Sequence, residues 1–270
     1  MTLEIGVLLP TATPDPAVPI IGDVKQAART AEELGLDSVW STDHLIASAP
    51  ILESTVVLGA AAGATERIRI GFGVLLLALR PVAWAAKQIS TLQHISGGRL
   101  EVGVGTGNPA HGDIGWRAAG QSYPDRGRRT DESLRLLPDL IAGRPATLAD
   151  GTEITLSPGA SVPPILVAGN VPAAHRRAAE FAEGWIGIAT PPADVARILA
   201  RLAELADGYG RPAPYAVVLD PHLDEDPKRA AEQLAAYVEA GTRRVILTQP
   251  DPNWRRVYEH AATIRALLAD

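Results

Sequence analysis

Two patterns of apolar positions alternate along the whole chain. Short apolar runs of strand length are separated by longer stretches whose apolar spacing is near 3.6, which is typical of amphipathic helices. The runs predict eight strands, over Glu4–Leu9, Ser38–Trp40, Ile68–Val74, Leu100–Val104, Ile165–Ala168, Trp185–Ile188, Tyr215–Leu219 and Val245–Leu247. The longer stretches predict eight helices, over Ile20–Leu34, Ser54–Ala64, Val82–Ser96, Asp125–Ile141, Ala173–Phe181, Pro192–Asp207, Lys228–Ala240 and Trp254–Leu268.

The junctions between helices and strands resemble one another. In four of them a glycine stands just past the helix, where left-handed backbone geometry would end it; these are Gly35, Gly97 or Gly98, Gly184 and Gly241. Strands that are joined through helices by such short connections run parallel. Eight strand–helix units in this length predict an α/β fold, a (β/α)8 TIM barrel. A doubly wound open sheet is the alternative, which the lack of a glycine fingerprint after the first strand disfavours.

One segment departs from the strand–helix alternation. The stretch Ala146–Leu156 carries an Asp-Gly pair between alternating residues, which predicts a small β-hairpin inserted after strand four and its helix. No stretch rich in Gly, Pro or Ser divides the chain, so we expect a single domain over residues 1–270.

Composition narrows the function classes. The 270 residues carry a net charge of −6, without a basic block, which argues against a nucleic-acid partner. The absence of cysteine excludes disulfides and thiolate nucleophiles. No apolar run reaches the length of a membrane span, and the first residues lack the basic region of a secretory signal. We therefore expect a soluble, cytoplasmic protein.

In a barrel of this kind the active site lies at the carboxyl ends of the strands. Asp43 and His44 follow strand two, and a histidine titrates near neutral pH, so His44 is a candidate general acid or base. In the structural alternative, Asp43 caps the next segment and His44 belongs to a wall. A metal site from His44, His111 and Asp113 is a further alternative, but the chain has no paired-histidine spacing and we expect no metal.

Two other loops offer backbone groups to a ligand. The run Gly103–Gly107 continues strand four into its loop, and glycine in a strand often marks the close approach of a ligand. The segment Val167–Asn170 leads into a helix whose N-terminus could bind an anion. Trp40, Trp116 and Trp185 are candidates for flat surfaces, with core packing favoured for Trp185.

Five ordered blocks carry a family resemblance. They are AEELGLDSVWSTDH, TERIRIGFGVLLLALRPV, KQISTLQHISGGRLEVGVGTG, YPDRGRRTDESLRLL and PPILVAGN. Together they resemble the bacterial luciferase-like monooxygenase family, over residues 1 to about 250. The resemblance implies a (β/α)8 barrel that binds either flavin mononucleotide (FMN) or the deazaflavin coenzyme F420. The compact chain resembles the deazaflavin-dependent branch.

The resemblance also implies residue roles. It implies that Asp43 and His44 lie beside the tricyclic ring, and that the Gly73-Val74 step forms a bulge behind the ring, often with a non-prolyl cis peptide bond. The positions implied to contact the ring and its tail are Thr106, Gly107 and Asn108, and those implied to hold the ribityl phosphate are Ala168, Gly169 and Asn170, with Thr190 nearby. Sugar-phosphate dehydrogenases of this branch have a glutamate proton donor where this chain has Asn108. Their chemistry is therefore not expected here.

These features lead to one leading function and two alternatives. We expect an oxidoreductase that transfers a hydride between coenzyme F420 and an unidentified, mainly apolar organic substrate. An FMN-dependent monooxygenase that uses reduced flavin and oxygen is the first alternative, and a non-catalytic flavin-binding protein is the second. Family members commonly dimerise through early helices, and the apolar helix Ser54–Ala64 predicts a homodimer.

Overall fold

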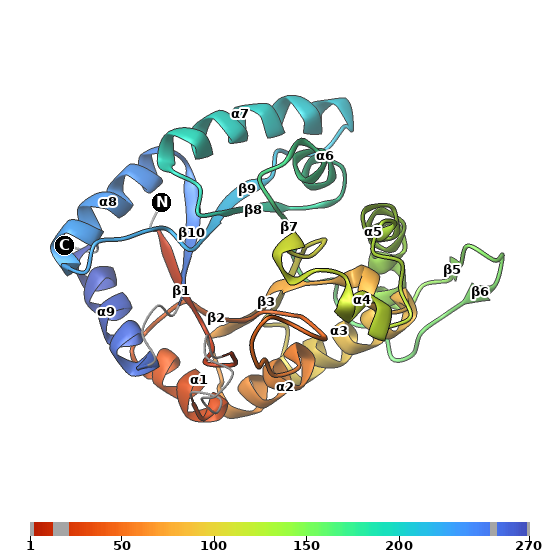
Figure 1. Cartoon of the computed structure of the whole chain (residues 1–270), viewed down its shortest axis with the longest axis horizontal. Coiled ribbons are helices and arrows are strands. Elements are labelled where there is room, and N and C mark those ends of the chain that lie inside the picture. The colour runs from red at the N-terminus through yellow and green to blue at the C-terminus, as the bar shows by residue number, and fades with distance from the viewer. Residues whose placement is uncertain (1–2, 13–21, 249–252, 269–270) are drawn as a thin grey trace.

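The computed structural model describes residues 3–12, 22–248 and 253–268. Within these ranges eight parallel strands close into a barrel, in the spatial order β1-β10-β9-β8-β7-β4-β3-β2, with helices around it (Figure 1). The barrel strands are β1 (Glu4–Leu8), β2 (Ser38–Ser41), β3 (Arg69–Leu75), β4 (Leu100–Val104), β7 (Ile165–Ala168), β8 (Gly184–Ile188), β9 (Tyr215–Leu219) and β10 (Thr242–Leu247). The predicted (β/α)8 barrel is confirmed.

Every predicted helix is present, with small shifts at the ends. The long helices are α1 (Val24–Glu33), α2 (Ser54–Ala64), α3 (Val82–Ser96), α5 (Arg126–Ala142), α6 (Pro172–Phe181), α7 (Pro192–Gly208), α8 (Pro227–Glu239) and α9 (Trp254–Leu267). The helix predicted from Ile20 begins at Val24, because the Asp23 side chain accepts hydrogen bonds from the backbone N–H groups of Lys25 and Gln26 and caps it there. Residues 20 and 21 of that prediction lie outside the described residues.

Three short elements in the loops were not predicted. They are the 3-10 helices η1 (Leu77–Leu79) and η2 (Pro109–His111) and the helix α4 (Ile114–Ala118). Elements of three to five residues are too short to show a hydrophobic period. All three follow the carboxyl ends of β3 or β4, so they belong to the end of the barrel that carries the candidate site.

The predicted hairpin is present as two short antiparallel strands, β5 (Ala146–Thr147) and β6 (Glu153–Ile154). It projects away from the barrel beside α5 (Figure 1). The hairpin is inserted between α5 and β7, as its position after strand four and its helix predicted.

For one of the four glycines predicted to end a helix, the prediction is wrong. Gly35, Gly97 and Gly241 have the expected left-handed backbone, with φ of 74°, 65° and 87°. Gly184, in contrast, is the first residue of β8. A Cβ there would lie 2.9 Å from both the Leu166 and the Tyr215 side chains, so close packing between strands is what requires a glycine at this position.

A tryptophan fills part of the barrel interior. Trp40 is fully buried, and its Nε1 donates a hydrogen bond of 2.8 Å to Ser38 Oγ. A Cβ at Gly71 would lie 2.4 Å from the Trp40 ring, so the glycine on the neighbouring strand makes room for the indole. Trp185 is also fully buried, as predicted.

Charged side chains fill the interior at the amino ends of the strands. Arg244, only 1% exposed, forms ion pairs with Glu4 and with the buried Glu101. Arg69 bonds the same two carboxylates, at 2.6 Å to Glu4 and 3.4 Å to Glu101. Burial raises the pKa of Glu4, but the two arginines outweigh it and hold that pKa below its usual value. These four side chains connect β1, β3, β4 and β10 across the barrel.

Candidate active site

A pocket lies at the carboxyl ends of the strands, where three connections meet. Its lining residues come from the segment after β2, from η1 and its flank, and from the segment between β4 and α5. They are His44, Leu45, Ile46, Leu76, Leu79, Gly107, Asn108, His111, Gly112, Gly115 and Trp116. The lining carries no carboxylate, lysine or arginine, and the two histidines are the only titratable side chains in it. The candidate residues His44, Gly107 and Asn108 are thus brought together, as the sequence indicated.

His44 contacts a second histidine across this pocket. Its ring and that of His111 pack edge to face, with 4.4 Å between the ring centroids. The His111 Nδ1 accepts a hydrogen bond from the Ser48 backbone N–H, at 3.4 Å. A ring nitrogen that accepts a hydrogen bond carries no proton, so this bond requires an unprotonated Nδ1 on His111.

The pKa of His44 lies below its ordinary value. Burial is the main cause, and the neighbouring His111 ring adds to it, whereas the Asp43 carboxylate acts in the opposite direction. His44 is therefore neutral at pH 7, and it can accept a proton at a ring nitrogen.

The Asp43 carboxylate faces the protein interior and is fully engaged. It accepts hydrogen bonds from Ser54 Oγ at 3.0 Å and from the Leu76 backbone N–H at 2.9 Å. It also forms an ion pair of 2.9 Å with Arg80, which precedes α3. Asp43 thus fastens the end of β2 to α2, η1 and the start of α3. Its partners come from segments 11 to 37 residues away, so the sequence alone could not name them.

The end of β3 is irregular where the family resemblance implied a bulge. The pairing of β3 with β4 shifts register between Phe72 and Leu75, and the peptide bond between Gly73 and Val74 is cis. A Cβ at Gly105 would lie 2.5 Å from the Val74 side chain. The glycine at the end of β4 therefore leaves room for Val74 at the barrel mouth.

The loop after β4 turns sharply at the predicted residues. Gly107 has a φ of 88°, which other residues adopt only under strain, and the half-buried Thr106 precedes it. The Asn108 side chain accepts a hydrogen bond of 3.0 Å from the Ala110 backbone N–H and so caps η2. This cap places His111 at the end of η2, facing the pocket.

The candidate residues after β7 and β8 form a second group, which does not line this pocket. The Asn170 amide donates to the Ile188 carbonyl at 2.8 Å and accepts from the Ile188 N–H and from Thr190 Oγ1, each at 3.2 Å. The half-buried Ala168 ends β7, and Gly169 follows it with a φ of 125°. Asn170 thus joins the two loops to each other.

This second group leads directly into α6, whose first turn has no side-chain cap. Backbone N–H groups at such a helix start, next to a glycine, suit an anion such as a phosphate. In α6 this anion site would be limited, because the first helical residue is Pro172, which has no N–H, and the Ala174 N–H donates to the Val171 carbonyl.

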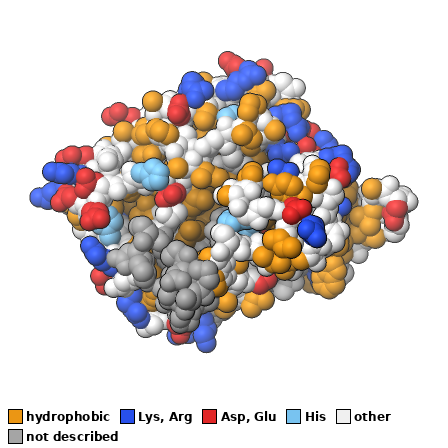
Figure 2. Space-filling model, viewed as in Figure 1, with side chains coloured by type: hydrophobic (Ala, Val, Ile, Leu, Met, Phe, Trp, Pro, Cys, Tyr) orange, Lys and Arg blue, Asp and Glu red, His pale blue; other side chains and the backbone are white. Residues whose placement is uncertain are grey.

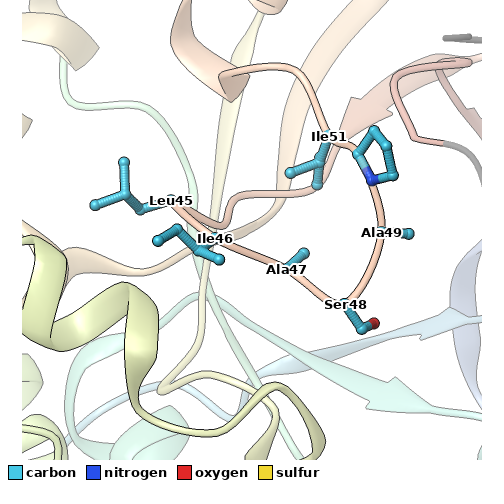
Figure 3. Close-up of a pocket in the computed structure, with 7 residues that line it drawn as sticks. Leu45, Ile46, Ala47, Ser48, Ala49 and Ile51 are labelled. Carbon is cyan, nitrogen blue, oxygen red and sulfur yellow. The ribbon is translucent and has the colours of Figure 1, made fainter. Parts of the chain in front are cut away.

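The segment after β2 has its own hollow, which the sequence analysis did not identify. Leu45–Ile51 curves in an arc, and the side chains of Ala47 and Ile51 point into it while Ser48 points away (Figure 3). The Leu52 N–H donates to the Thr11 carbonyl at 2.9 Å and holds the arc against the segment after β1. The apolar run in this segment was the only sequence signal for it.

Charge is distributed unevenly on the face that carries α4. Charged side chains gather at its periphery, whereas hydrophobic and uncharged side chains are more common towards its middle (Figure 2).

Among the described residues, no group of three or more His, Asp or Glu side chains is arranged to hold a metal ion.

The profile of the luciferase-like monooxygenases matches residues 3–268. The chain belongs to this family. The members of this family among the relatives are oxidoreductases, which makes the protein an enzyme of that class.

Two relatives illustrate the range of the family. An uncharacterized protein of Mycobacterium tuberculosis is 32% identical over 210 residues, which cover 75% of this chain and 72% of that protein. The 5,10-methylenetetrahydromethanopterin reductase of Methanolobus tindarius is 30% identical over 247 residues, which cover 86% of this chain and 72% of that protein.

Two solved structures share the fold. One is an F420-dependent secondary alcohol dehydrogenase with an F420–acetone adduct, with a TM-score of 0.80, 20% identity and coverage of 98% of this chain and 99% of the other. The second is the oxygenating constituent of 3,6-diketocamphane monooxygenase from Pseudomonas putida with FMN, with a TM-score of 0.78, 18% identity and coverage of 100% and 98%. At these identities the likeness concerns the fold alone.

None of the helices in the described part of the chain has the length and apolar character needed to cross a membrane.

Proposed function

We propose that this protein transfers a hydride between coenzyme F420 and a small, mainly apolar organic substrate. The observation that carries the proposal is the pocket at the barrel mouth, which has no carboxylate, lysine or arginine in its lining and holds the neutral His44. A neutral histidine accepts the proton that accompanies hydride removal, and a lining without carboxylate, lysine or arginine suits an uncharged ring and substrate. Relatives such as the F420-dependent glucose-6-phosphate dehydrogenase of Beutenbergia cavernae support the choice of cofactor.

The residues take distinct roles in this proposal. His44 is the acid–base residue, and Asp43 positions it by fastening the end of β2. Gly73, Val74, Thr106, Gly107 and Asn108 border the ring, and Ala168, Gly169, Asn170 and Thr190 form the loops that hold the phosphate tail. The deazaflavin supplies the hydride-accepting carbon when it is bound. Asn108 has no acidic proton to donate, so a sugar phosphate is not the proposed substrate.

An FMN-dependent monooxygenase is the second candidate. The fold shared with the diketocamphane enzyme, whose structure contains FMN, favours it. In this alternative the pocket would keep water away from the reduced flavin.

Equilibrium titrations with F420 and with FMN, followed by cofactor absorbance and fluorescence, test the assignment. We expect F420 to bind more tightly than FMN under the same conditions. Tighter binding of FMN would overturn the assignment in favour of the monooxygenase. Arg201→Met, a substitution of an exposed residue on the outer helix α7, serves as the control and should bind both cofactors like the wild type.

We also propose a cytoplasmic homodimer with one domain per chain, over residues 1–270. On the outer face of α2 and α3, Val56 is 72% exposed and Trp84 is 66% exposed, and apolar side chains of this size are commonly covered in oligomers. Sedimentation at micromolar concentration should give a dimer, and Val56→Glu together with Trp84→Ser should give a monomer. A wild-type monomer would contradict the dimer.

A further inference from the structure

The pocket holds a histidine for which the proposed function has no role. His111 stands at the end of η2, and its ring packs edge to face against His44, with the centroids 4.4 Å apart. The two rings come from connections that follow different strands, β2 and β4. Both line the same pocket, so whatever binds there meets the pair and not one ring alone.

Two hydrogen bonds donated by backbone N–H groups hold His111 in this position. The Asn108 side chain caps η2 through the Ala110 N–H, and the Ser48 N–H donates to the His111 Nδ1. Ser48 belongs to the same segment as His44, so this bond joins the two histidine-bearing loops directly. A proton on Nδ1 would abolish the bond, because a protonated imidazole nitrogen is a donor and cannot accept.

The charged groups near the pair are few. Asp43 precedes His44, and its carboxylate is neutralised by Arg80. Asp113 follows His111 by two residues and is exposed to solvent. Every other lining residue of the pocket is uncharged. If both rings were protonated, two positive charges would be in contact among uncharged lining residues, with no carboxylate in the lining to offset them.

We propose that His111 is a positioning residue for His44: beyond the proton that each neutral ring carries, the pair takes up one further proton and not two, which leaves one ring neutral and able to accept a proton from a bound ligand. The inference rests on the proposed function for the use of that nitrogen. The pairing itself is a property of the protein without ligand. The burial of His44 and the charge of a protonated His111 act in the same direction, towards a neutral His44.

The test is a titration of the histidine rings by NMR in the protein without cofactor. His111→Asn retains an acceptor for the Ser48 N–H but cannot be protonated, and His111→Phe retains the ring contact but cannot be protonated either. With either substitution the pKa of His44 should rise. The rise should be about 0.7 pH unit. Two unit charges 4.4 Å apart in bulk water repel by about 0.9 kcal/mol, and 1.36 kcal/mol corresponds to one pKa unit.

His94→Asn is the matched control, because His94 lies near the opposite end of the barrel and bonds the Gly159 carbonyl. It should leave the His44 titration unchanged. An unchanged His44 pKa in both His111 variants would overturn the proposal and show that burial alone lowers it. If one variant does not fold, the other still decides the question.

A second readout separates this inference from the proposed function. With a substrate in hand, the acid limb of the kcat/KM profile should move to higher pH in His111→Asn, in parallel with the His44 pKa, while cofactor affinity stays the same. A raised His44 pKa without a shifted acid limb would retain the proton pairing but reject its role in turnover. Absence of any F420-linked activity in the wild type would reject the proposed function and leave the NMR result standing.

Discussion

The two ends of the barrel treat polar groups in opposite ways. At the amino ends, Glu4, Arg69, Glu101 and Arg244 fill the interior and satisfy one another. At the carboxyl ends the pocket lining has two histidines in contact and no carboxylate, lysine or arginine. The first arrangement needs no partner from outside, whereas the second offers uncharged walls and proton-binding nitrogens to a ligand.

Backbone conformation differs in the same direction. The two residues other than glycine with positive φ among the described residues, Ala189 at 46° and Asp220 at 59°, directly follow β8 and β9. Such conformations cost about 1–3 kcal/mol each, and they persist where the surroundings hold them. Thr248 Oγ1 donates to the Asp220 carboxylate at 2.6 Å and is one such support. Strain therefore gathers at the end that carries the candidate site, and we infer that one end supports stability and the other supports function.

The largest expected effect is on turnover at the carboxyl end. Replacing His44 by alanine should lower turnover by roughly 10²–10⁴-fold, the usual contribution of a general acid or base. Cofactor affinity should change less than about tenfold, since the tail is held by backbone groups elsewhere. Single-turnover hydride transfer and cofactor titration measure the two quantities.

His94→Ala is the matched control for this experiment, since it removes a histidine near the amino ends, and it should leave turnover unchanged. If the His44 variant binds cofactor poorly but turns over normally when saturated, His44 belongs to the cofactor wall and has no acid–base role.

The next largest effect concerns stability at the amino end. Arg244→Met removes one of the two arginines that pair with the buried Glu101. It should lower the free energy of unfolding by about 3–5 kcal/mol. Cofactor affinity of the folded fraction should not change. Denaturant titration checks the first expectation. The control Arg201→Met breaks an exposed pair with Glu204 and should cost less than about 1 kcal/mol. Equal losses in both variants would contradict the role of the buried cluster.

A smaller effect is expected where side chains fasten loops. Asn170→Ala removes the bonds to Ile188 and Thr190 and should weaken cofactor binding by about tenfold, the equivalent of one to two hydrogen bonds, with little change in turnover at saturation. Gln93→Ala is the counterpart at the amino end, where that side chain bonds Ser161 and Leu100. It should lower stability and leave cofactor affinity unchanged. Equal cofactor affinity in the two variants would contradict the functional difference between the two ends of the barrel.

The barrel could be predicted from the sequence because its signals are local and repeated. Apolar runs, helical spacing and glycines such as Gly97 act within a few residues, and they recur along the chain. The role of Gly184 was predicted wrongly, because a glycine is needed there for close contact with Leu166 and Tyr215 on the neighbouring strands. The positions of His44 and Asn108 at the mouth followed from the rule that sites lie at the carboxyl ends of strands.

The contacts within the site could not be predicted, because they join distant segments. The bond from Arg80 to Asp43 spans 37 residues, and the one from Ser48 to His111 spans 63. His111 was considered only as a possible metal ligand, and its contact with His44 depends on the short helix η2, which has no periodic signal. Local pattern thus predicts which residues reach the mouth, and tertiary structure decides which of them meet.

Hydrogen exchange followed by mass spectrometry, with and without saturating F420, tests the division between the two ends most directly. We expect protection in the segments that follow β2, β3, β4, β7 and β8, which include His44, Val74, Asn108, Asn170 and Thr190. Peptides at the amino ends, around Glu4 and Glu101, should exchange at the same rate in both states. Protection confined to the amino ends or to the outer helices, or none at a saturating F420 concentration, would contradict the account.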